Sequence, residues 1–230
     1  MENQINSPDE RRKEAARLCE QGGSYLEKKD IDRALDAFSA AHTIYHELSD
    51  NESRVGVLQK IADIYLRKKQ NEKALETYDT LLSLVREMNN RTAEARLLNN
   101  TGLLCARTGA YERALKFFRK SLDLFESAGD RLNSARQWGN IGSVQRDLSD
   151  HHGALESYKK ALPIFEELGD REGVADQYTN IAYIYAMKGD AGKALSWYKK
   201  GYAIYKETDS SKKADVTRRN ITSLDPNFGG

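Results

Sequence analysis

Residues 180–200 read NIAYIYAMKGDAGKALSWYKK, and residues 140–160 read NIGSVQRDLSDHHGALESYKK. Both stretches begin with Asn-Ile, carry Ala-Leu at the same interior place and end with Tyr-Lys-Lys. The two copies are separated by 40 residues, so the pattern indicates a structural unit that is repeated along the chain.

The same period extends over most of the 230 residues and produces three columns of similar side chains. Each column holds a small residue or an aromatic ring, and the spacing within a unit places them on helical faces. Small residues on two helices allow a close approach, and the aromatic ring fills the space beside that contact. In the first unit we therefore predict a helix A over residues 14–28, a tight turn and a helix B over residues 31–47. The columns are Ala34, Ala74, Ala114, Ala154 and Ala194; Phe38, Tyr78, Phe118, Tyr158 and Tyr198; and Gly22, Ala62, Gly102, Gly142 and Ala182.

The unit resembles the tetratricopeptide repeat, because Trp138-x2-Ile141-Gly142 and Ala154-x3-Tyr158 follow that family's consensus. The resemblance covers residues 15–210 and implies an all-α fold, a right-handed α-α superhelix of five helix-turn-helix repeats with a C-terminal capping helix. The period of 40 residues exceeds the commoner period of about 34. In this respect the chain is similar to kinesin light chains, spindle-orientation adaptors and bacterial peptide-sensing regulators.

The register of the columns sets the expected domain boundaries. We predict a flexible N-terminal tail over residues 1–12, a repeat array over residues 13–211, a capping helix over residues 212–223 and a disordered tail over residues 224–230. A capping helix is expected because the last unit of a solenoid otherwise leaves an apolar side open to water. The five repeats are predicted at about 14–53, 54–93, 94–133, 134–173 and 174–211.

Composition excludes several classes of function. Lys and Arg number 36 against 35 for Asp and Glu, so the net charge of +1 gives no general attraction to nucleic acid or anionic lipid. No apolar run approaches the roughly 18 residues that a membrane span requires. The N-terminal stretch lacks the basic and apolar regions of a signal peptide. We therefore expect a cytoplasmic protein with no nucleic-acid or membrane partner.

The sequence carries no recognisable catalytic or cofactor motif. His42 and His46 are four residues apart, a spacing that can hold a metal, but the repeat aligns His42 with packing positions and His46 with outward ones. Cys19 and Cys105 match no metal-ligand spacing. There is no phosphate-binding glycine loop and no nucleophile elbow. We predict that the protein is not an enzyme and needs neither a cofactor nor a metal.

In the family that the chain resembles, the A helices line a concave surface that receives a peptide. If the Gly/Ala column is the eighth place of each repeat, the second, sixth, ninth and thirteenth places share one face of helix A. The sixth place is asparagine in three repeats, Asn100, Asn140 and Asn180, with Asn99 beside it. A side-chain amide both donates and accepts hydrogen bonds, so these residues suit a peptide backbone. The alternative is that they join neighbouring A helices.

Basic residues dominate the same face in repeats 2–4, although Asp63 and Asp147 lie among them. Arginine suits carboxylates, including a C-terminal carboxylate. The alternative is a solvated charged face with internal ion pairs such as Arg107 with Asp147. Apolar residues between the charges, among them Leu66, predict small apolar pockets. The remaining predicted groove residues are Lys60, Arg67, Arg96, Leu103, Arg107, Arg136, Arg146, Tyr183 and Met187.

Together these features predict a non-enzymatic adaptor that binds a protein or peptide partner, acidic or C-terminal, in the groove of the A helices. Two alternatives remain from sequence. One is a self-assembling structural scaffold, which would be a homo-oligomer. The other is an RNA-binding solenoid, against which the net charge and the lack of regular aromatic stacking places both speak.

Overall fold

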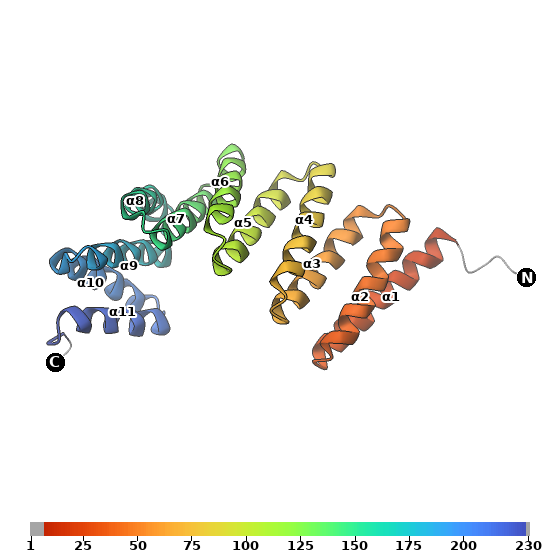
Figure 1. Cartoon of the computed structure of the whole chain (residues 1–230), viewed down its shortest axis with the longest axis horizontal. Helices are drawn as coiled ribbons and strands as arrows, with labels where there is room; N and C mark the ends of the chain where they lie inside the picture. The colour runs from red at the N-terminus through yellow and green to blue at the C-terminus, as the bar shows by residue number, and fades with distance from the viewer. Residues whose placement is uncertain (1–6, 229–230) are drawn as a thin grey trace, which may run out of the picture. The chain divides into compact units, whose positions relative to one another are not determined.

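The computed structural model describes residues 7–228, which form eleven helices and no strand (Figure 1). Most of the helices are 17 residues long and are joined by three-residue turns. The helices are α1 (Pro8–Glu27), α2 (Ile31–Glu47), α3 (Asn51–Arg67), α4 (Asn71–Glu87), α5 (Arg91–Arg107), α6 (Tyr111–Ser127), α7 (Arg131–Asp147), α8 (His151–Leu168), α9 (Arg171–Met187), α10 (Ala191–Glu207) and α11 (Ser211–Leu224). The odd-numbered helices α1 to α9 are the predicted A helices, and the even-numbered ones are the B helices.

Each turn uses one residue in the left-handed region of the backbone, and these residues recur every 20 positions. Gly129 and Gly169 have φ values of 70° and 69°, which agrees with the left-handed caps expected at such glycines. In the turn after α7, the Ser149 N–H donates to the Arg146 carbonyl and the Asp150 N–H donates to the Gln145 carbonyl, both over 2.8 Å. The ten residues are Lys29, Ser49, Lys69, Asn89, Gly109, Gly129, Ser149, Gly169, Gly189 and Asp209.

An aspartate follows the left-handed residue in six of these turns and caps the next helix. Its carboxylate accepts a hydrogen bond from the backbone N–H three residues later, which satisfies a donor that the first helical turn leaves open. The turn sequence thus ends one helix and starts the next within three residues, so consecutive helices pack as antiparallel neighbours. The capping residues are Asp30, Asp50, Asp130, Asp150, Asp170 and Asp190.

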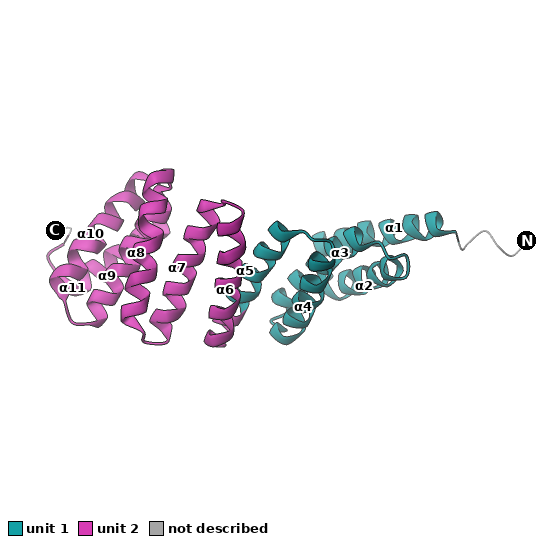
Figure 2. Cartoon of the chain, turned by 90° about the horizontal axis from the view of Figure 1, so that it is seen from above, with its two compact units in different colours: residues 1–104 teal, residues 105–230 magenta. Residues whose placement is uncertain are grey.

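The helices group into two compact units, residues 1–104 and 105–230, shown in teal and magenta in Figure 2. Within unit 1, α1 packs on α2, α2 on α3 and α3 on α4. Within unit 2, each helix from α6 to α11 packs on the next, and α7 also contacts α9. The division falls inside α5, where the sequence repeat continues without a change of period.

The small-residue columns are buried, as the packing hypothesis requires. The five alanines of the B helices, from Ala34 to Ala194, have no exposed surface, and the Gly/Ala column is buried in every repeat. A Cβ on Gly142 would lie only 2.6 Å from the Tyr158 ring, and one on Gly22 would lie 2.8 Å from the Phe38 ring. The aromatic residue therefore packs directly against the small residue of its own repeat.

Both predicted tails are shorter than the sequence suggested. Helix α1 begins at Pro8, because the Ser7 hydroxyl accepts from the Glu10 N–H over 3.2 Å and proline suits the first helical position. Residues 8–12 are therefore helical, while residues 1–6 lie outside the described part. At the other end the Phe228 ring lies 5.7 Å from the Tyr202 ring, so residues 225–228 pack on α10 rather than forming a disordered tail. Residues 229 and 230 also lie outside the described part.

Candidate functional site: pockets between consecutive A helices

Three pockets occupy the same place in the repeat. Each is formed between two consecutive A helices, or between the last A helix and α11, and has a floor from the intervening B helix. The floor residues are Val85, Phe165 and Tyr205, which are equivalent in the repeat and buried. We name them the α3–α5 pocket, the α7–α9 pocket and the α9–α11 pocket, and their volumes are about 280, 380 and 350 Å³.

The sixth place of the repeat supplies an asparagine to every one of these pockets. Asn100, Asn180 and Asn220 line the α3–α5, α7–α9 and α9–α11 pockets respectively, and Asn140 lines the α7–α9 pocket from its other wall. The Asn99 side chain is half-buried and donates to the Asn100 oxygen over 3.2 Å. The structure thus places the predicted Asn100, Asn140 and Asn180 in pocket walls, adds Asn220 of α11, and leaves Asn99 outside the three pockets.

The three pockets differ in charge. Arg96 lines the α3–α5 pocket beside Asn90 and Thr92, and no carboxylate is among the residues described there. The α9–α11 pocket has an aromatic wall that includes Tyr183 and Tyr198, with Lys212 and Lys213 at its edge. Burial raises the pKa of Tyr198 to about 12. A hydrogen bond from Asn220 acts in the opposite direction and lowers this pKa.

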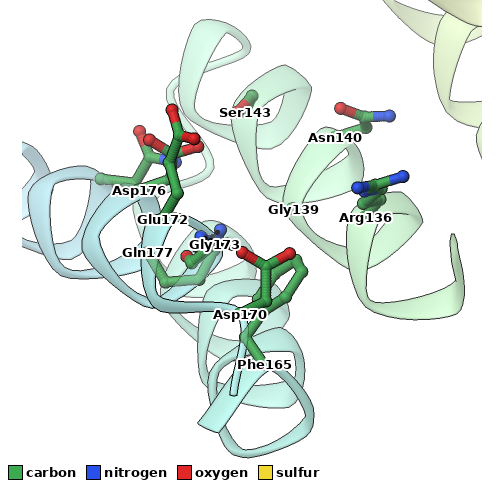
Figure 3. A pocket seen from close by; sticks show the side chains of 11 residues that line it. Arg136, Gly139, Asn140, Ser143, Phe165, Asp170, Glu172, Gly173, Asp176 and Gln177 are labelled. Atoms are coloured by element: carbon green, nitrogen blue, oxygen red, sulfur yellow. Dashed lines mark hydrogen bonds between the residues drawn. The ribbon is translucent and has the colours of Figure 1, made fainter. Parts of the chain in front are cut away.

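In the α7–α9 pocket the two walls carry opposite charge (Figure 3). Arg136 and Asn140 come from α7, whereas Asp170, Glu172 and Asp176 come from the start of α9. Asp176 occupies the second place of helix A, whereas Asp170 and Glu172 precede that place and were missed by the sequence analysis. The repeat alignment could have found them, since they occupy the places of Asn90 and Thr92 two repeats earlier.

Lys213 of α11 compensates much of this negative charge. Its Nζ lies 2.7 Å from Asp176 Oδ1 and 2.9 Å from Glu172 Oε1. The hydrogen bond and charge of Lys213 lower the pKa of Glu172. Asp176 Oδ1 also accepts from the Tyr205 hydroxyl over 2.6 Å. The pKa of Tyr205 is raised, first by burial and then by this bond to a carboxylate.

Arg146 is more constrained than the sequence predicted. Its side chain is half-buried, its Nε donates to Asp147 over 2.9 Å, and its guanidinium lies 5.5 Å from the centre of the Tyr183 ring. Among the described residues Asp147 is therefore paired with Arg146, and the pairing with Arg107 that the sequence allowed is absent.

The other predicted groove residues are exposed on A helices and line none of the three pockets. Leu103 and Met187 are 47% and 58% exposed, so they offer apolar contacts on open helix faces. The full set is Lys60, Arg67, Leu103, Arg107 and Met187.

No group of three or more metal-ligating side chains occurs among the residues that the structure describes. The His42 and His46 rings lie 6.2 Å apart, and burial is the main cause of a lowered pKa at His42. Within residues 7–228 no helix combines the length and hydrophobicity needed to cross a membrane.

A family model described as tetratricopeptide repeat matches residues 54–127 and 133–207. The chain belongs to the tetratricopeptide repeat family. Its predicted all-α repeat fold is confirmed, and so is its resemblance to that family. A comparison with curated protein sequences finds no match.

Solved tetratricopeptide-type structures share the arrangement at low identity. The apo form of RapI is 21% identical, with a TM-score of 0.81 over 92% of this chain and 77% of that one. A Rap protein complexed with Competence and Sporulation Factor is 19% identical, with a TM-score of 0.66 over 89% of this chain and 57% of that one. A putative kinesin light chain from Podospora anserina, with nearly identical repeats, is 12% identical, with a TM-score of 0.69 over 90% and 100%. At these identities the likeness shows the fold.

Proposed function

We propose that this tetratricopeptide repeat chain is a non-enzymatic adaptor that binds a peptide segment of a partner protein along the A helices. The observation that carries the proposal is the recurrence of one pocket at equivalent places, each with the sixth-place asparagine on its wall. Within either unit such amides can bind the backbone of an extended segment without demanding a particular sequence. The family membership and the Rap protein complexed with Competence and Sporulation Factor support the same class of function.

We propose separate roles for the asparagine and arginine side chains of the pocket walls, based on their chemistry. Asn100, Asn140 and Asn180 bind the backbone of the segment. Arg96 and Arg136 bind carboxylates, because a guanidinium offers paired donors to a planar anion. Arg96 is exposed and faces no carboxylate within its own pocket, so acidic residues of the segment are expected at the α3–α5 pocket.

A selection from a random peptide library tests the proposal. The full chain is immobilised, and the enriched sequences are synthesised with a fluorescent label for anisotropy titration. We expect enriched peptides to carry Asp, Glu or a free C-terminus. Arg96→Glu should weaken their binding by about tenfold or more, because charge-assisted hydrogen bonds contribute about 1.5–3 kcal/mol. Asn180→Ala should weaken binding several-fold through loss of neutral hydrogen bonds.

The matched control is Lys159→Glu, which reverses an exposed charge on helix B α8, outside the three pockets. Its affinity should equal that of the unmodified chain. Enriched peptides that bind equally well to the Arg96→Glu and Asn180→Ala variants would place the binding surface elsewhere and refute the proposal.

A further inference from the structure

The α7–α9 pocket contains a buried hydrogen-bond acceptor without a donor. Gln177 is 4% exposed and lies in the wall of this pocket (Figure 3). Its Nε2 donates to the Gly173 carbonyl over 3.4 Å, whereas no donor among the described residues reaches its Oε1. Such buried acceptors are rare in folded proteins and need an explanation.

The amide of Gln177 faces the place where α7 has no side chain. A Cβ built on Gly139 would lie 3.5 Å from both Oε1 and Nε2 of Gln177. The equivalent residues in the other two pockets leave no such acceptor: Leu97 is apolar, and the Thr217 hydroxyl donates to the Lys213 carbonyl over 2.8 Å. The open acceptor therefore distinguishes the α7–α9 pocket from the other two pockets.

Negative charge surrounds this acceptor. Asp170, Glu172 and Asp176 line the same pocket, while Arg136 lies on the opposite wall with its Nη1 donating to Asn133 over 3.3 Å. Lys213 binds Glu172 and Asp176, but it does not line the pocket itself. Asp170 uses one oxygen to cap the Gly173 N–H over 2.9 Å. The α9 wall thus presents acceptors of several orientations and an excess of negative charge.

From this arrangement we infer that the α7–α9 pocket is a subsite for an arginine side chain of the bound peptide, recognised by the Gln177 amide oxygen together with Asp170 and Glu172. A guanidinium has five N–H donors in one plane, so it can bond to a neutral oxygen and to carboxylates at the same time. An ammonium group is a compact point charge and matches these separated acceptors less well.

The inference rests on the proposed function, since it names one residue that the bound segment carries. The two remain separable because they make opposite predictions for one variant. Arg136→Glu removes a positive charge from the pocket, so it should weaken an acidic peptide and strengthen binding of a cationic one.

The test is an NMR titration of the full ¹⁵N-labelled chain with the tripeptide N-acetyl-Gly-Arg-Gly-amide. We expect saturable shifts at the Gly139 and Asn180 backbone amides and at the Gln177 side-chain amide. The analogue with citrulline, a neutral residue of the same shape, should produce no saturable shifts, and the lysine analogue should bind more weakly. Shifts that are the same for arginine and citrulline would overturn the inference.

Two variants sharpen the titration. Gln177→Leu introduces the residue that the α3–α5 pocket has at the equivalent place, Leu97, so the fold has a precedent for it. It should lower the affinity for the arginine tripeptide about tenfold while raising the melting temperature, because it removes an unsatisfied buried acceptor. Glu172→Gln, at an exposed position, should lower the affinity without loss of folding. Unchanged affinity in both variants would refute the subsite, whatever the peptide selection yields.

Discussion

The α3–α5 pocket of unit 1 and the α7–α9 pocket of unit 2 are built on the same frame but carry different chemistry. Asn100 and Asn180 occupy equivalent places, 80 residues apart, and a buried B-helix side chain forms each floor. At the place that Arg96 has in the α3–α5 pocket, the α7–α9 pocket has Asp176. In the same alignment Asn90 corresponds to Asp170, and Thr92 corresponds to Glu172. The repeat thus fixes where the two pockets lie, and the second place of helix A with the residues before it sets the charge of their walls.

The turns of the two units differ in a similar way. In unit 1 the left-handed residues are Lys29, Ser49, Lys69 and Asn89, none of which is glycine. In unit 2 four of the six are Gly109, Gly129, Gly169 and Gly189. Residues with a Cβ are strained in this region of the backbone. Unit 1 therefore carries more backbone strain per turn, although most helices of both units have 17 residues.

The largest effect is expected where the shared frame itself is broken. Ala154→Leu places a large side chain in a fully buried column and should destabilise unit 2 by about 1–3 kcal/mol through overpacking. Lys159→Leu, at an exposed position of the same helix, should change the free energy of unfolding little. Urea unfolding of both variants measures the difference, and equal stabilities would contradict the assigned role of the alanine column.

The second-largest effect is expected from changing the charge of the residues that line the α3–α5 pocket. Arg96→Asp combined with Thr92→Glu gives the α3–α5 pocket the counterparts of Asp176 and Glu172 of the α7–α9 pocket. Affinity for acidic peptides should fall about tenfold to a hundredfold, in line with the loss of charge-assisted hydrogen bonds. The variant should gain only weak affinity for the arginine tripeptide, because Leu97 cannot supply the acceptor that Gln177 provides. Anisotropy titration measures both, and full arginine affinity in this variant would show that Gln177 is dispensable.

A smaller effect is expected from exchanging turn residues between the units. Lys69 and Gly189 occupy equivalent A–B turns with φ values of 57° and 78°. Lys69→Gly should stabilise unit 1, and Gly189→Lys should destabilise unit 2, each by about 0.5–1 kcal/mol, since only glycine adopts this conformation without strain. Hydrogen exchange of amides within each unit separates the two responses. If neither substitution changes the exchange rates, turn strain does not distinguish the units.

The fold was predictable from sequence because close packing of the helices requires particular side-chain sizes at positions that recur with the repeat. Ala154 and Gly142 must be small where helices touch, and Tyr158 must fill the adjacent space, so each column repeats at 40 residues. The ends were predicted less well because they lie outside the repeat. Ser7 caps the first helix, and Phe228 contacts the ring of Tyr202. Neither contact belongs to a repeated column of the sequence, so the repeat does not predict it.

The candidate site was predictable only in part. Arg96, Asn100 and Asn180 follow from the helical face that the repeat defines, and they line pockets. Glu172 and Gln177 were missed because the α7–α9 pocket also uses the first turn of α9 and its buried side. The contacts of Arg146 with Asp147 and Tyr183 were not predicted, because they depend on side-chain conformations that spacing does not determine.

The smallest expected effect is a difference in acid response between the two pockets. Lys213 lowers the pKa of Glu172 below the ordinary value of 4.5, so the folded state holds this carboxylate in its charged form. The associated stability is present above that value and is lost as the pH falls through the lower folded pKa. Glu172 is exposed, which makes its contribution to stability small.

In the Lys213→Met variant the Glu172 pKa should rise toward 4.5 in a carboxyl NMR titration. Acidic-peptide binding at the α3–α5 pocket should stay the same, because no carboxylate lines that pocket among the described residues. A Glu172 pKa that does not move would assign its lowering to a group other than Lys213.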